Sequence, residues 1–102
     1  MKSIKKMVAH IDDELKGAER YAECMIEALA KNDRKTAEQY YAMANDELRH
    51  SNILHEITVG MIDNLRNIYT APQEMLDKWE TVHNDYIKRT AYIKQMIAVY
   101  KN

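Results

Sequence analysis

Two glutamates and a histidine interrupt the apolar faces of the helices predicted for the first half of the chain. At about 100° of turn per residue, Glu14 falls inside the apolar arc of the first helix. Glu47 falls near the middle of the apolar stripe of the second helix, and His50 lies one turn later at the edge of that stripe. Residues three apart on a helix point to the same side, so Glu47 and His50 can reach one metal ion.

A carboxylate on a buried helix face needs a positive partner. Removing an ionised carboxylate from water costs several kcal/mol even after relaxation, so a basic side chain, a bound cation or a proton must offset it. Lysine and arginine are missing from the buried arcs of the first two predicted helices. This absence favours a metal ion, although a neighbouring subunit could also supply a base.

The chain of 102 residues predicts one all-α domain, residues 1–102, built from a long antiparallel helical hairpin and a third helix. Two glycines and one proline are too few for a protein of sheets and tight turns. Apolar residues recur at steps of three and four, which is helical spacing. Ser3 and Asp33 are candidate N-caps, and Pro72 separates the last two helices. The predicted helices are 3–31, 34–69 and 73–101.

Charge and composition exclude several classes of function. The 15 basic and 16 acidic side chains are mixed along the chain and leave a net charge of −1, so we expect no nucleic-acid partner. No run approaches the ~20 apolar residues of a membrane-spanning helix, so we expect no membrane partner and a soluble protein. A single cysteine, Cys24, and a polar start without a following apolar run predict a reducing, cytoplasmic location.

Three helices of this length leave apolar surface uncovered. A hairpin plus one helix cannot close a four-helix core, so part of each apolar stripe would face water in a single chain. Large exposed apolar patches usually mark an interface. We therefore expect a homodimer or a higher homo-oligomer.

The segment from Glu14 to Tyr21, followed by Glu47-Leu-Arg-His50, resembles the ferritin-like superfamily. The similarity is to the first hairpin of rubrerythrin-type proteins and to half-size members such as the encapsulated ferritins, and it covers about the first 60 residues. In that family a first-helix glutamate precedes a tyrosine by seven residues, and a Glu-x-x-His follows on the next helix. The resemblance implies a ferritin-like four-helix bundle completed by dimerisation.

The same resemblance implies a two-metal carboxylate site shared between two chains. Each copy would contribute Glu14, Glu47 and His50, with Glu47 as the bridging ligand. Oxygen-rich ligands with two imidazoles suit iron, here a di-iron pair, or manganese. By resemblance the reaction would be oxidation of ferrous iron, a ferroxidase activity, or peroxide reduction. The residues alone leave open whether the chain is an enzyme.

A metal-free alternative remains open. Glu14, Glu47 and His50 could satisfy one another across a dimer, which would make the chain a helical oligomerisation or interaction module with a ferritin-like fold. The remaining polar candidates have simpler explanations as surface or structural residues, with Tyr21 and Tyr40 open as partners of the ligands. The histidines and the second Glu-x-x-His motif in this group are His10, His55 and Glu80 with His83.

Overall fold

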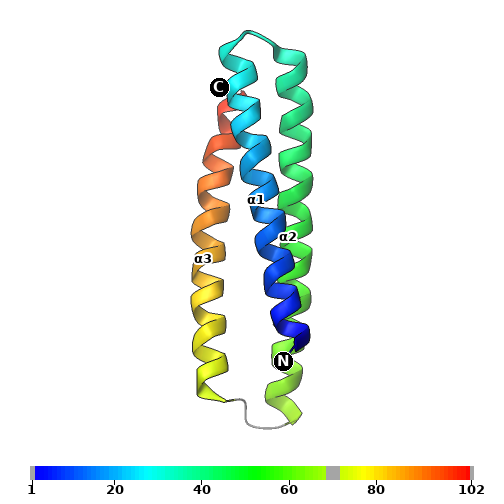
Figure 1. The fold of residues 1–102 in the computed structure, drawn as a ribbon, viewed down its shortest axis with the longest axis vertical. Helices are drawn as coiled ribbons and strands as arrows, with labels where there is room; N and C mark the ends of the chain where they lie inside the picture. Colours follow the sequence, from blue (N-terminus) through cyan, green and yellow to red (C-terminus); the bar gives the residue numbers. More distant parts are fainter. Residues whose placement is uncertain (1, 69–71, 102) are drawn as a thin grey trace.

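Three α-helices and no β-strand make up the part of the chain that the computed structural model describes, residues 2–68 and 72–101. The helices are α1 (Lys2–Ala30), α2 (Arg34–Ile68) and α3 (Gln73–Ala98), and a short 3₁₀ helix, η1 (Val99–Lys101), follows α3. The predicted all-α fold class, with three helices, is confirmed. The molecule is a rod of 56 × 17 × 17 Å in which the three helices run side by side (Figure 1).

The turn between α1 and α2 forms because the chain satisfies the orphan backbone groups at both helix ends. Asn32 adopts a left-handed φ of 59°, and the backbone N–H groups of Asn32 and Asp33 donate to the carbonyls of Leu29 and Ala28. Asp33 then caps α2, since its carboxylate accepts a hydrogen bond of 3.1 Å from the backbone N–H of Thr36. Hydrogen bonding to the side chain of Thr36, and then to its backbone N–H, lowers the pKa of Asp33. The tight turn makes α1 and α2 an antiparallel hairpin.

Small side chains let the two long helices approach closely. The buried residues of the hairpin include five alanines, together with Ser51 and Thr58 on α2. The hydroxyl groups of Ser51 and Thr58 donate to carbonyl oxygens of their own helix. Larger side chains fill the remaining core between the three helices. The main core cluster consists of Ile11, Leu15, Ala18, Ala22, Ala44, Leu48, Ile93 and Ile97.

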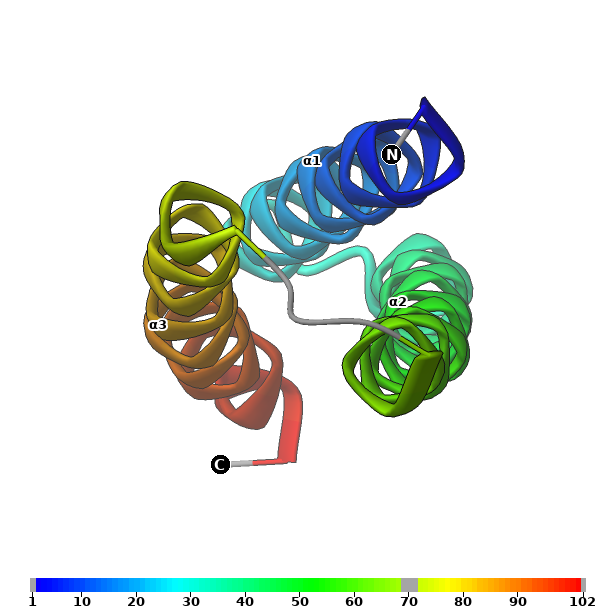
Figure 2. The same ribbon diagram turned by 90° about the horizontal axis from the view of Figure 1, so that it is seen from below.

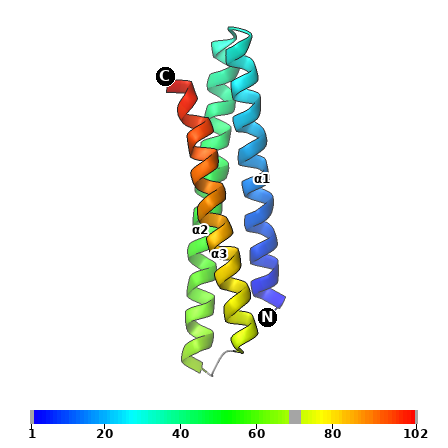
Figure 3. The ribbon, with the colours of Figure 1, turned by 90° about the vertical axis from the view of Figure 1, so that its left-hand side faces the viewer.

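Helix α3 runs parallel to α1, and its C-terminal end lies at the same end of the rod as the α1–α2 turn (Figures 1 and 3). Seen along the rod, the three helices stand at the corners of a triangle (Figure 2). The two buried residues of α3, Ile93 and Ile97, lie in its C-terminal half. In the middle of α3, Arg89 forms an ion pair of 2.6 Å with Asp12 of α1. The helix is therefore anchored mainly through its second half.

The observed helices differ from the predicted ones at their ends. Ser3 lies inside α1 and does not cap it, because helical geometry already includes Lys2. The last residues of the predicted third helix form the tighter 3₁₀ turn η1, as is common at helix ends. The predicted end of the second helix, residue 69, lies outside the described residues. Within the described segments, no helix combines the length and hydropathy needed to cross a bilayer.

Candidate metal centre

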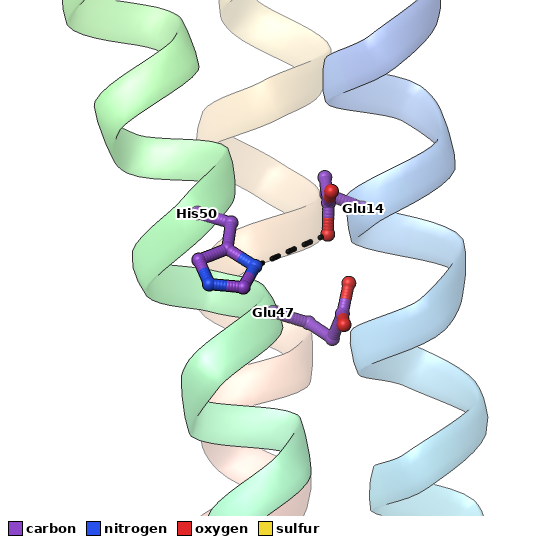
Figure 4. A group of neighbouring side chains, drawn as sticks. All are labelled: Glu14, Glu47 and His50. Carbon is purple, nitrogen blue, oxygen red and sulfur yellow. Dashed lines mark ion pairs between the residues drawn. The ribbon is translucent and has the colours of Figure 1, made fainter.

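Glu14, Glu47 and His50 converge at the middle of the hairpin. Glu14 extends from α1 toward α2, and Glu47 and His50 extend from successive turns of α2 toward it (Figure 4). One donor atom from each residue lies within 4.8 Å of those of the other two. The Nδ1 atom of His50 is 3.6 Å from Oε2 of Glu14. The three residues singled out in the sequence therefore form one cluster.

The cluster is less buried than the apolar stripes suggested. The Glu14 side chain is 18% exposed and the His50 side chain 45% exposed. The reason is the position of α3, which passes behind the hairpin and leaves the face that carries the cluster uncovered (Figure 4). Within one chain the cluster is therefore only partly buried.

The two carboxyl groups are close enough to compete for one proton. The hydrogen bond that protonated Glu47 donates to the Glu14 carboxylate raises the pKa of Glu47 to about 7, and burial and the negative charge of Glu14 act in the same direction. The same hydrogen bond lowers the pKa of Glu14, which is further stabilised as an anion by His50 and His10. At neutral pH Glu47 is therefore only about half protonated, and its proton is shared with the Glu14 carboxylate.

No basic side chain of residues 3–68 or 72–101 pairs with these carboxylates apart from the two histidines. The lysine and arginine ion pairs of the structure all involve other acids. Donor atoms about 2 Å from one ion lie at most about 4 Å apart, so small side-chain rotations would bring all three donors onto a cation. Two carboxylates and an imidazole, without a resident counter-charge, fit a divalent metal ion of the iron or manganese type.

Gly17 provides the space that Glu47 occupies. A Cβ atom added at Gly17 would lie 3.2 Å from Oε2 of Glu47, which is tighter than an ordinary contact. Gly17 was not predicted from the sequence to belong to the site. The signal was present, because a glycine inside a helix costs up to about 1 kcal/mol relative to alanine, and this one follows Glu14 by three residues.

Three further residues, His10, Tyr21 and Tyr40, were considered as partners of the ligand candidates. His10 is 55% exposed, as expected for a surface histidine, but its Nε2 atom also lies 3.3 Å from Oε1 of Glu14. Tyr21 and Tyr40 stack on each other with ring centroids 6.2 Å apart. Among the hydrogen bonds of the described residues, none joins either tyrosine to a ligand candidate.

The second Glu-x-x-His motif does not join the cluster. Glu80 is exposed on α3, as its position on the helix predicted. His83 forms a hydrogen bond to His55 of α2 instead of pairing with Glu80. The sequence analysis treated His55 as structural and did not connect it with His83, because no sequence pattern shows which residues of α2 and α3 face each other.

No family model, curated protein or solved structure matches this chain. The chemistry of the site therefore has to be inferred from its own residues.

The shared proton predicts a pH-dependent stability. Because the folded-state pKa of Glu47 exceeds its ordinary value of 4.5, the stabilising hydrogen bond is complete at low pH and is lost as the pH rises toward 7 and beyond. We expect Glu47→Gln to remove this loss and to raise the free energy of unfolding by roughly 1 kcal/mol at pH 8, with chelator present. Urea denaturation between pH 5 and 8 measures it, with exposed Glu80→Gln as the control. If Glu47→Gln lost as much free energy of unfolding between pH 5 and 8 as the wild type does, the shared proton would be contradicted.

The two glycines provide a matched test of the crowding at Glu47. A Cβ atom at Gly60 meets nothing within 4 Å, so Gly60→Ala should gain the full helix preference of about 1 kcal/mol in free energy of unfolding. Gly17→Ala should gain clearly less, because the carboxylate of Glu47 must move by a few tenths of an ångström. Urea denaturation compares the two variants. Equal increases in the free energy of unfolding would show that Gly17 provides no space that the Glu47 carboxylate needs.

Proposed function

We propose that this chain is a ferritin-like di-metal carboxylate protein whose site is completed by a second copy. The observation that carries the proposal is the convergence of Glu14, Glu47 and His50 on the uncovered face of the hairpin. Each copy would supply these three ligands, and two copies would supply the four carboxylates and two imidazoles that hold a metal pair in such bundles. Iron is the preferred ion, with manganese as the second choice.

A second copy would also cover apolar surface that one chain leaves exposed. Met43 and Ile57 lie two turns before and two turns after His50 on the same face of α2, and Ile53 flanks that face. Their exposed fractions are 40%, 49% and 44%. Exposed apolar side chains around a polar centre are typical of an interface. Pairing two hairpins through this face would give a four-helix core and bury the site.

The proposed activity is oxidation of ferrous iron or reduction of peroxide. A bound iron pair supplies the redox chemistry, with open coordination positions for the oxidant. The protein residues hold it: Glu14 and Glu47 give anionic oxygen ligands, and His50 gives a neutral nitrogen ligand. The shared proton on Glu47 would be released when metal binds, since a metal ligand must be deprotonated.

One specific observation supports a metal-free alternative. Within a single chain, Glu14 already contacts His10, His50 and Glu47, so these groups partly satisfy one another. The alternative function is a helical oligomerisation module in which this polar cluster specifies the pairing of two hairpins.

Metal analysis separates the two functions. After anaerobic incubation of the metal-free protein with ferrous salt and removal of excess ion, we expect about one iron per chain and a dimer or larger species by light scattering. Glu47→Ala should lose the iron, because it removes the bridging ligand. Glu80→Ala changes the matching residue of the exposed motif on α3 and should keep it.

A different outcome of the metal analysis would support the metal-free module. Wild-type protein that binds no iron, together with a Glu47→Ala variant that is as stable or more stable, would support the metal-free module and contradict the metal site. If iron binds, oxygen consumption on addition of ferrous iron to the wild type, absent in Glu47→Ala, tests the proposed oxidation.

A further inference from the structure

His55 of α2 and His83 of α3 form a hydrogen bond that the proposed metal site does not use. The Nε2 atom of His55 and the Nδ1 atom of His83 are 2.8 Å apart. The ring of His55 also stacks on Tyr86, with centroids 4.3 Å apart, and lies 5.5 Å from the ring of Trp79. These four residues, the histidine cluster, join the N-terminal half of α3 to α2.

The histidine cluster holds a part of α3 that has little other attachment. The buried residues of α3, Ile93 and Ile97, belong to its other half. On the side facing α1, the N-terminal half of α3 borders an apolar groove of about 630 Å³. Trp79 and Tyr86 line this groove as well as contacting His55. Loss of the bond between the histidines would therefore free one end of α3 and widen the groove.

The bond between two imidazoles depends on the number of protons they carry. Two neutral rings can form it, because one nitrogen donates and the other accepts. A single added proton still leaves one acceptor. When both rings are protonated, both facing nitrogens are donors and both rings are positive, so the bond is lost and the rings repel each other.

We propose that His55 and His83 are a pH-sensitive latch, which holds the N-terminal half of α3 against α2 at neutral pH and releases it in mildly acidic solution.

The surroundings of His55 set the direction of this response. Burial, followed by the charge of His83, lowers the pKa of His55 below 6.5, and Glu56 of α2 acts weakly in the opposite sense. On α3 the groups that face it are His83, the neutral Tyr86 and Trp79. Because the released chain binds protons more readily, the latch contributes fully above pH 6.5 and weakens as the pH falls below that value.

Hydrogen exchange resolved by segment tests the latch. Exchange of backbone amides in residues 75–86 and 90–98 is measured at pH 7.5 and 5.0 with chelator present, and each rate is corrected for its intrinsic pH dependence. We expect protection of residues 75–86 to fall about tenfold or more at pH 5.0. Residues 90–98, which contain the buried anchors, should keep their protection.

A double variant, His55→Gln with His83→Asn, replaces the two facing nitrogens by amide groups that still form hydrogen bonds and do not titrate. It should show no change in protection between the two pH values, whereas the control His10→Gln should keep the wild-type response. Equal protection of residues 75–86 at both pH values in the wild type would overturn the latch. If the double variant keeps its helicity by circular dichroism but still loses protection of residues 75–86 at pH 5.0, the latch would also be overturned.

Discussion

The meeting of two carboxyl groups at the middle of the hairpin is the constraint on which the rest of the structure depends. Glu14 and Glu47 approach closely enough to share a proton. A chain selected only for stability would place apolar side chains there, because paired acids in a partly buried position are costly. The small core residues that draw α1 and α2 together, and the missing side chain at Gly17, both bring these groups closer.

The third helix divides the hairpin into two different faces. One face carries the core residues that Ile93 and Ile97 cover, together with the apolar groove and the histidine cluster. The other carries Glu14, Glu47 and His50, and no helix of the described residues covers it (Figure 4). The proposed second copy would cover this face and supply three further ligands.

Much of this arrangement was predictable from the sequence. Helical spacing located three helices, and the capping role of Asp33 is confirmed by its bond to Thr36. Helical spacing also predicted that Glu47 and His50 lie on one side of α2 and that Glu14 lies on the apolar face of α1. Contacts between α3 and the hairpin were not predictable, because periodicity shows which face of a helix is apolar but not which residues of two helices meet. The bond between His55 and His83 depends on that register.

The most direct test of the shared metal site is a crystal structure of the protein loaded with ferrous iron without oxygen, with iron located by its anomalous scattering. The proposal predicts two hairpins facing each other and an iron pair between them, bound by Glu14, Glu47 and His50 of both copies. A structure in which this face is free of iron, or in which the hairpins pair through another surface, would contradict it.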